Sequence, residues 1–411
     1  MSLALSLHAA GLTDVEVFES ASSPRDGGVG IDVHPPAVRE LAELGLLPEL
    51  EPLATPTAEL VMYSRHGRRV LAERRGRAAG YRWSQLSIHR GHLLRVLHRT
   101  VVDRLGADRI HHGHHLARAG SDGDHAVAMF VDRPSGAPLA EIQADVLVGC
   151  DGVHSAVRSA LFPRERAPLW NGVTSWRGIA EAPPFLSGQA VVMAGHADRR
   201  LVVSPLTTTA RGDRVLVNWV AEHRTASGRP MPSQDWDRTV DIDEVLATFG
   251  DFHLDFIDFP ALVRASEAVF QYPVVDRDPL DRWTHGRVTL LGDAAHPMYP
   301  VGSNGASQAI VDGRVLARHL ALAESVDGAL AAYEAERLPA TSKMVRATRE
   351  HGLARCLELV EQRAPDGFER LEDVFALGEL ERLAEDAKAV AGFAVHTLNH
   401  RPSLSVHQPV A

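Results

Sequence analysis

The sequence of 411 residues has only two cysteines, Cys150 and Cys356, and they lie far apart. Two isolated thiols exclude a disulfide framework and a cysteine-built zinc site, and they suit a reducing compartment. No apolar run approaches the roughly 20 residues that a helix needs to cross a bilayer. The segment Met1–Leu7 is too short for a secretory signal and lacks its basic flank. We therefore expect a cytoplasmic protein.

An excess of positive charge is also lacking. The chain has 43 Lys and Arg against 53 Asp and Glu, a formal net charge of −10, whereas nucleic-acid binders normally carry a basic patch. The Arg-rich segment 65–77 is balanced by acids elsewhere, and we interpret it as solvated surface. With 45% hydrophobic and 23% charged residues the composition is that of a globular protein long enough for two domains. Neither nucleic acid nor a membrane is an expected partner.

Helical and strand-like patterns alternate in the first part of the chain. Apolar residues at helical spacing in 3–10 precede a β-rich run, 15–19, which ends in Glu19. A helix that leads into a strand ending in an acid is typical of the second half of a βαβ unit. Helical patterns follow at 35–50 and 88–105. Strand patterns then occupy 110–151 and end in an apolar run that suits a buried parallel strand.

The pattern changes between about residues 170 and 273, where short strand-like runs follow one another. This region predicts a mixed or antiparallel sheet inserted between halves of a nucleotide-binding domain. A further buried strand at 288–293 comes next, followed by a loop and a helix that extends through residue 320. From about residue 330 the sequence is helical and charged.

Three acids stand at the ends of strand-like runs: Glu19, Asp151 and Asp293. An acid at the carboxyl end of a strand can accept hydrogen bonds from ribose hydroxyls, although Asp and Glu also begin turns and cap helices. Gly152, in the turn after Asp151, would let the backbone approach a ligand closely. Beyond Asp293, the segment 300–309 places a glycine-rich turn at the start of a helix. Its N–H groups suit a negatively charged ring or a pyrophosphate.

These motifs resemble the para-hydroxybenzoate hydroxylase family of FAD-dependent aromatic monooxygenases over nearly the whole chain. Within that family the chain is most similar to the phenazine-carboxylate monooxygenases. The stretches that carry this likeness are Gly28–Ile31, Ser87–Gly91, Thr174–Gly178, Val217–Val220 and Gln271–Pro279.

The resemblance implies an α/β fold with three parts. A Rossmann-like FAD-binding domain with a parallel sheet would comprise 1–165 and 281–345. A substrate domain with a mixed β-sheet would be inserted at 166–280, and a small part of about 55–85 would join it. C-terminal helices would form the region 346–411.

The resemblance also implies which residues bind FAD. Glu19 and Arg90 would contact its ribose and pyrophosphate region, and Asp293 its ribityl and pyrophosphate segment. The loop that follows Asp293 would lie against the isoalloxazine ring, where backbone N–H groups stabilise the anionic reduced flavin. The complete set of cofactor-binding candidates is Glu19, Arg90, Asp151, Gly152, Asp293, Gly302, Ser303, Asn304 and Gly305.

One part of the family pattern is missing from the printed sequence. The family opens with a strand and a Gly-x-Gly-x-x-Gly turn whose amides neutralise the pyrophosphate, and this sequence begins just after the last of those glycines. We expect a misassigned start codon or a trimmed sequence. A chain that truly lacked this segment should bind FAD poorly and fold badly.

Other candidate residues have a plain structural alternative. Four histidines between 111 and 115 look like a metal cluster, but no acid or cysteine completes a ligand set, so we predict no metal site. Arg177 would meet a substrate carboxylate in a bidentate pair or form a salt bridge. Trp219 and Tyr272 would line a flat substrate pocket or belong to the core of the inserted sheet. His296 is expected to be structural.

The leading functional hypothesis is a single-component hydroxylase. NADH or NADPH would reduce FAD, and one oxygen atom of O₂ would be transferred to an aromatic or N-heteroaromatic ring, phenazine-like or salicylate-like. The protein would position the ring, supply dipoles and exclude water. The alternatives are a flavin-dependent oxidoreductase without oxygenation, and a non-catalytic truncated homologue. The expected partners are the small aromatic substrate and O₂, and a homodimer is possible.

Overall fold

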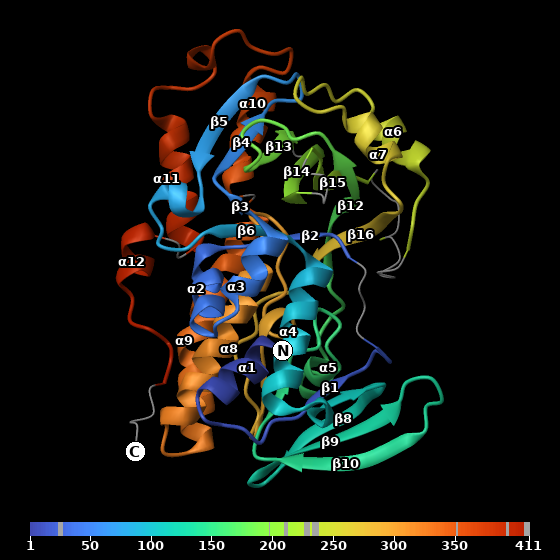
Figure 1. Cartoon of the computed structure of the whole chain (residues 1–411), viewed down its shortest axis with the longest axis vertical. Helices are drawn as coiled ribbons and strands as arrows, with labels where there is room; N and C mark the ends of the chain where they lie inside the picture. The colour runs from blue at the N-terminus through green and yellow to red at the C-terminus, as the bar shows by residue number, and fades with distance from the viewer. Residues whose placement is uncertain are drawn as a thin grey trace.

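The computed structural model describes residues 1–23, 28–196, 198–208, 213–225, 231, 238–350, 352–391 and 394–406. The molecule is elongated, with a large sheet at one end, helices in the middle and a small three-stranded sheet at the other end (Figure 1). This is an α/β fold with a large mixed sheet and C-terminal helices, which confirms the predicted fold class. In the described part of the chain, no helix is both long and apolar enough to span a membrane.

The middle of the molecule contains two pairs of short parallel strands. β1 (Val17–Glu19) pairs with β7 (Ile110–His112), and β11 (Leu147–Gly149) pairs with β17 (Val288–Leu290). Parallel partners need long crossover connections, and here each pair is joined through helices and further strands. The predicted parallel strands are therefore present, as two separate two-stranded sheets.

Helices surround these parallel strands (Figure 1). Helices α1 and α8 pack closely at Gly313 of α8, because a Cβ there would lie only 3.2 Å from the Cα of Leu3 on α1. The longer helices are α1 (Ser2–Ala9), α2 (Pro35–Glu43), α4 (Arg90–Leu105), α8 (Gly305–Leu322) and α9 (Val326–Arg349), and the short ones nearby are α3 (Leu47–Leu50), α5 (Ala156–Leu161) and α12 (Val395–His400).

Two small antiparallel sheets flank the helices. One has the strand order β10–β9–β8 and lies at the end of the molecule; the other has the order β2–β6–β3 and lies between the helices and the large sheet (Figure 1). Their strands are β8 (His114–Asp122), β9 (His125–Asp132), β10 (Pro138–Ala144), β2 (Gly30–Val33), β3 (Ala54–Thr57) and β6 (Gln85–His89).

The large sheet has seven strands in the order β16–β12–β15–β14–β13–β4–β5. All neighbours are antiparallel except β13 and β4, which are parallel. β4 and β5 come from the segment 55–85 that the sequence suggested for the substrate part. The strands are β4 (Glu59–Tyr63), β5 (Arg69–Arg74), β12 (Leu169–Ala182), β13 (Ala190–Gly195), β14 (Arg199–Thr208), β15 (Val215–Arg224) and β16 (Val269–Asp276).

The two faces of this sheet differ because side chains alternate along a strand. One face is apolar and packs against α6 (Ile242–Phe249) and α7 (Phe259–Arg264), with Trp176 and Trp219 in its core. The opposite face turns toward the rest of the molecule. At its β4–β5 end it is covered by α10 (Arg355–Arg363) and α11 (Glu379–Ala391). Its middle carries polar side chains, and we call this part the site face: Ser175, Arg177, Arg200, Asn218, Glu222 and Tyr272.

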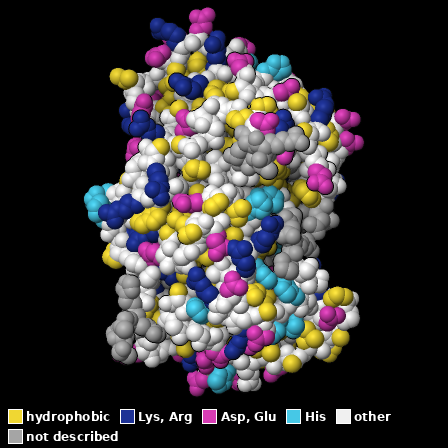
Figure 2. Space-filling model, viewed as in Figure 1, with side chains coloured by type: hydrophobic (Ala, Val, Ile, Leu, Met, Phe, Trp, Pro, Cys, Tyr) yellow, Lys and Arg dark blue, Asp and Glu magenta, His cyan; other side chains and the backbone are white. Residues whose placement is uncertain are grey.

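The surface carries charges of both signs, interspersed over the view in Figure 2. In the Arg-rich segment, Arg65 pairs with Glu361 at 3.1 Å and Arg75 with Glu73 at 2.7 Å. Two arginines of this segment thus have acidic partners.

A buried charge network ties β17, α8 and α9 together. The carboxylate of Asp312 on α8 is fully buried and accepts from His296 Nε2 at 2.5 Å and from Arg337 Nε at 2.6 Å. It also accepts from the backbone N–H of Gly292 at 3.2 Å. Burial alone would raise the pKa of Asp312, but His296 and Arg337 hold that pKa at about 2. His296 is part of this structural network.

Replacing Asp312 by Asn should destabilise the fold strongly. The change leaves Arg337 buried without its carboxylate, which costs about 3–5 kcal/mol. The pKa of Asp312 is about 2 in the folded chain and ordinarily 3.8, so its stabilisation is present above about pH 4 and is lost as the pH falls toward 2. Urea unfolding between pH 7 and pH 3 measures both effects. Asp281→Asn, at an exposed position, is the control, and equal unfolding midpoints for the two variants would contradict the assignment.

Gly178 is a tightly packed position on the apolar face of the large sheet. A Cβ at Gly178 would lie 2.5 Å from a ring carbon of Trp219. Gly178→Ala should therefore lower the free energy of unfolding by about 1–3 kcal/mol through overpacking. Gly120→Ala on β8 is the matched control, because among the described residues no atom lies within 4 Å of its added Cβ. Thermal unfolding of both variants tests this; an unchanged Tm for Gly178→Ala would show that the Trp219 ring can move aside.

Candidate functional site

The turn after β17 brings Asp293 next to the start of α8. β17 leads into the short 3₁₀ helix η4 (Gly292–Ala294), and the chain then runs through a loop to Gly305. A Cβ at Gly305 would lie 3.5 Å from Oδ1 of Asp293. Two predicted site residues that are separated in sequence are thus adjacent, and the absence of a side chain at Gly305 leaves room beside the carboxylate.

Asp293 is solvent-accessible, although protein surrounds it on most sides. This enclosure raises the pKa of Asp293, while nearby His296 and Arg90 act to lower it and Asp312 to raise it. The influence of Arg90 shows that this predicted residue, the first of α4, lies in the same region. Arg90 also lies beside Gly28, where a Cβ would be 3.4 Å from the Cβ of Arg90. The carboxylate of Asp293 is thus surrounded by protein on most sides, open to solvent on one side, and close to the positive charge of Arg90.

The loop before α8 has an unusual backbone. Gly302 has φ of 76° and Ser303 has φ of 54°, a conformation that costs a non-glycine residue about 1–2 kcal/mol. Such strain tends to persist at ligand-binding sites. In the described part of the chain, Oδ1 of Asn304 is buried without a hydrogen-bond partner. The first N–H groups of α8 also have no partner within the helix. The loop therefore offers backbone donors and one unmatched acceptor, which fits the polar edge of a flavin ring.

Glu19 ends β1 and Asp151 follows the end of β11 by two residues, and both carboxylates have local partners. Glu19 Oε1 accepts from the backbone N–H of Ala21 at 2.7 Å and stays exposed. Asp151 accepts from Ser155 Oγ at 2.5 Å and from Val157 N at 3.1 Å, and so caps α5. Roles of both acids toward FAD remain predictions.

The turn after Asp151 leaves open space. Gly152 has φ of 81°, and among the described residues no atom lies within 4 Å of a Cβ built there. Cys150, just before the turn, is solvent-accessible yet enclosed, and burial raises its pKa to about 12. The amino group of Met1 is close enough to Cys150 and Glu19 for their charges to interact. The ends of β1 and β11 and the start of α1 thus meet in one place.

The histidines of the segment 111–115 contact neighbouring side chains. His111 Nε2 contacts Glu16 Oε2 at 2.6 Å, and His98 stacks on His112 with ring centroids 5.9 Å apart. No group of three or more His, Cys, Asp or Glu side chains with metal-binding geometry occurs within the described ranges.

Arg177 stands on the site face beside Ser175 and Tyr272. Its Nε donates to Ser175 Oγ at 3.1 Å, and its guanidinium carbon lies 5.6 Å from the centre of the Tyr272 ring. No carboxylate of the described residues forms an ion pair with it. Desolvation lowers the pKa of Arg177, with Glu222 and Tyr272 opposing and Arg90 adding to the effect. Arg177 and Tyr272 are thus brought together, on the side of the sheet that faces Arg90.

Trp219 lies on the other face, which corrects its prediction as a substrate contact. Its ring is fully buried, packs edge-on against Phe259, and donates from Nε1 to Ser266 Oγ at 2.9 Å. On β15 it shares the parity of Val217 and Ala221, whereas Asn218 lies on the site face. We therefore leave Trp219 out of the proposed site.

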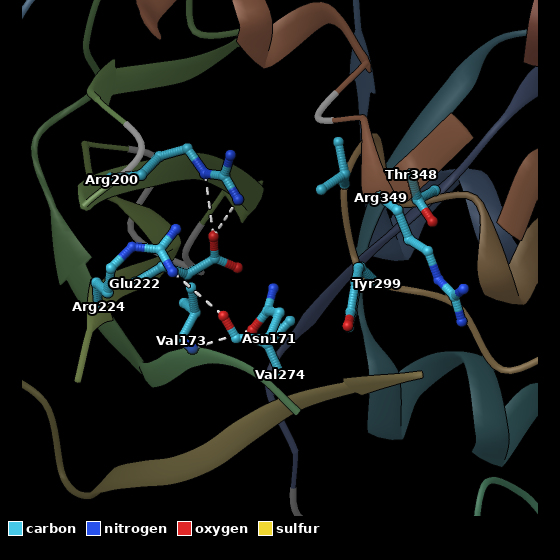
Figure 3. A pocket seen from close by; sticks show the side chains of 10 residues that line it. Asn171, Val173, Arg200, Glu222, Arg224, Val274, Tyr299, Thr348 and Arg349 are labelled. Atoms are coloured by element: carbon cyan, nitrogen blue, oxygen red, sulfur yellow. Dashed lines mark hydrogen bonds and ion pairs between the residues drawn. The ribbon is translucent and has the colours of Figure 1, made fainter. Parts of the chain in front are cut away.

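A cavity of about 100 Å³ opens between the site face and the loop before α8 (Figure 3). One wall carries the ion pair of Arg200 with Glu222, and the other carries Tyr299 and Arg349. Arg349 is anchored outside the cavity by Asp276 at 2.6 Å. Sequence analysis missed these residues; only the place of Tyr299 just before the glycine-rich loop hinted at one of them. The full lining is Asn171, Val173, Arg200, Glu222, Arg224, Val274, Tyr299, Val301, Thr348 and Arg349.

Comparison with known proteins shows the family of the chain. Residues 1–348 match the FAD binding domain family. Phenazine 1,6-dicarboxylic acid hydroxylase from Lysobacter antibioticus is 39% identical over 361 residues, which cover 86% of this chain and 88% of the relative. 6-Hydroxynicotinate 3-monooxygenase from Pseudomonas fluorescens is 30% identical, over 82% of this chain and 85% of the relative.

A solved structure supports the fold. Salicylate hydroxylase in complex with its substrate has a TM-score of 0.71 with this chain at 23% identity, and the match covers 100% of this chain and 96% of the other. The predicted family and its phenazine-related branch are confirmed by these findings. The chain therefore belongs to the FAD-binding-domain family of aromatic hydroxylases.

Proposed function

We propose that this FAD-dependent monooxygenase hydroxylates a planar aromatic or N-heteroaromatic ring that carries a carboxylate. NADH or NADPH is the reductant, and O₂ is the source of the oxygen atom. One observation carries the substrate proposal: Arg177 is a largely enclosed guanidinium that forms no ion pair with a carboxylate of the described residues, because nearby Glu222 is paired with Arg200. A cation in that position is ready for an anionic ligand.

FAD, when bound, supplies the activation of O₂ and the transfer of one oxygen atom to the ring. The residues of this chain would hold and orient it. Asp293 would accept hydrogen bonds from hydroxyl groups of the cofactor, and Arg90 would balance its negative charge. The backbone N–H groups of 302–305 would stabilise negative charge on the flavin ring. Glu19 would accept from a ribose hydroxyl, and Gly152 would leave room for the cofactor beside its turn.

The substrate would lie between the site face and this loop. Arg177 would bind its carboxylate through two parallel N–H···O bonds, and the Tyr272 ring would support the guanidinium. The cavity beside Tyr299 would take part of the ring and keep water away from it. The relatives named for phenazine 1,6-dicarboxylic acid and 6-hydroxynicotinate act on carboxylated rings, which supports a carboxylate as the group that Arg177 recognises.

The same proposal divides the chain between two tasks. The FAD-binding part comprises 1–165 and 281–345, except for β4 and β5, which belong with the substrate part at 166–280. Thr348 and Arg349, at the end of α9, would close the cavity, and the helices of 346–411 form the C-terminal region. The proposal includes a cytoplasmic location, where NAD(P)H is available. It also includes assembly into a homodimer.

The visible spectrum of the purified protein tests the proposed function first. A bound flavin that is bleached by NADH or NADPH and recovers in air supports it. The protein is then incubated under ¹⁸O₂ with a phenazine carboxylate, with 6-hydroxynicotinate and with salicylate. Labelled oxygen in a product identifies oxygen transfer. Reduction of the flavin without label in any product would instead favour an oxidoreductase that transfers hydride only.

Arg177→Gln should weaken the binding of a carboxylated substrate. Loss of the charge-assisted contacts costs about 2–3 kcal/mol, which is roughly a 30- to 150-fold rise in KM, whereas the loss should be small for the matching carboxamide. Steady-state kinetics with both compounds measure this difference. Arg118→Gln, at an exposed position on β8, is the control. A carboxylate KM that is the same in Arg177→Gln as in the parent protein would rule out this role.

Asp293→Asn should weaken FAD binding about tenfold, because a charged acceptor is replaced by a neutral one. The parent protein should lose affinity as the pH falls toward the raised pKa of Asp293, since protonation removes the charged acceptor. The variant should show a flatter pH profile. Fluorescence titration of FAD from pH 5 to pH 8 measures both, with the exposed Asp366→Asn as control. Equal affinities and equal pH profiles would exclude Asp293 from the cofactor site.

A further inference from the structure

His34 joins the strand β2 to the glycine-rich loop across the molecule. Its side chain is 5% exposed, and Nε2 lies 2.7 Å from the carbonyl oxygen of Gly302. The backbone N–H of His34 donates to Ser307 Oγ at 3.0 Å. On the other side of the ring, Nδ1 lies 3.3 Å from Gln85 Oε1 on β6. His34 therefore fixes both the beginning of the loop and the first turn of α8.

The chemistry of these contacts determines where the protons lie. A carbonyl oxygen only accepts, so Nε2 of His34 carries hydrogen whether the ring is neutral or charged. In the neutral ring Nδ1 is an acceptor, and the amide of Gln85 must turn its NH₂ group toward it. In the charged ring Nδ1 donates, and the amide must present its oxygen. Because a rotation of one amide satisfies both states, His34 can gain a proton from solvent without losing its contact with Gly302.

We propose that His34 is a positioning residue for the flavin and a source of pH-dependent charge beneath it. Its bond to the Gly302 carbonyl keeps the N–H groups of 302–305 directed toward the flavin ring. When His34 gains a proton, its positive charge stabilises the anionic reduced flavin. This inference rests on the proposed function, which places the flavin against this loop.

The surroundings of His34 set the pH range of the effect. Burial lowers the pKa of His34; Asp32 on the preceding strand β2 acts to raise it, and Arg75, just after β5, acts to lower it. The contacts with Gly302 and Gln85 raise it. On α8, the neutral Ser307 accepts from the backbone N–H of His34. The net effect lowers the pKa of His34, so the ring gains its proton only at a more acidic pH than an ordinary histidine does.

Two substitutions separate the positioning role from the charge. His34→Gln keeps an amide that can donate to Gly302 but does not titrate, and His34→Leu removes the donor. His115→Gln, at an exposed position on β8, is the matched control. For the parent protein and each variant, the measurements are FAD affinity, the midpoint potential of bound FAD from pH 5 to pH 8, and amide hydrogen exchange of residues 302–307 without FAD.

The parent protein and His115→Gln should show an additional rise in midpoint potential on acidification. In His34→Gln this rise should be absent, with FAD affinity within about threefold of the parent. His34→Leu should bind FAD about tenfold more weakly, because a buried carbonyl loses its donor, and should exchange the loop amides faster. An unchanged pH dependence in His34→Gln overturns the charge role. Unchanged exchange and affinity in His34→Leu overturn the positioning role. A parent protein that binds no FAD would instead refute the proposed function, and the inference with it.

Discussion

The carboxylate of Asp312 is the point on which the geometry of the site depends. It binds the first backbone N–H of η4, the ring of His296 and the guanidinium of Arg337. Through these three bonds the end of β17, the loop that follows and the helix α9 are fixed relative to α8. Asp293 and the glycine-rich loop both belong to the segment held in this way. The fully buried carboxylate of Asp312 thereby fixes the position of Asp293, whose carboxylate remains accessible to solvent.

The large sheet contributes the other half of the site, because side chains alternate between its two faces along each strand. Every second side chain of β12 and β15 is apolar and packs against α6 and α7. The side chains between them must face the rest of the molecule, and there the chain has placed Arg177, Asn218 and Glu222. Asn218 Oδ1 accepts from the backbone N–H of Gly30 at 2.8 Å, which fastens the sheet to β2. The cavity lies where this polar face meets the loop before α8.

Much of this arrangement could be predicted from sequence because its signals are local. An apolar run followed by Gly-Asp predicts β17 and the acid at its end, and a glycine turn predicts the start of α8. For Trp219 the sequence left a substrate pocket and the sheet core open, although the apolar residues Val217 and Ala221, two positions away on either side, already favoured the core that the structure shows. His34 gave no signal at all. Its partner Gly302 is 268 residues away, and only the fold brings the two together.

The parallel pairing of β4 with β13 has a consequence for how the chain is made. β4 and β5 form a hairpin that leaves the ribosome early, but the other edge of β4 finds its partner only when β13 has been synthesised. Until then the backbone groups of that edge are unpaired, and such an edge invites pairing with other chains. Non-local strand pairing of this kind also folds slowly. The yield of soluble protein should therefore depend on how fast residues 75–195 are translated and on chaperones that cover the waiting edge.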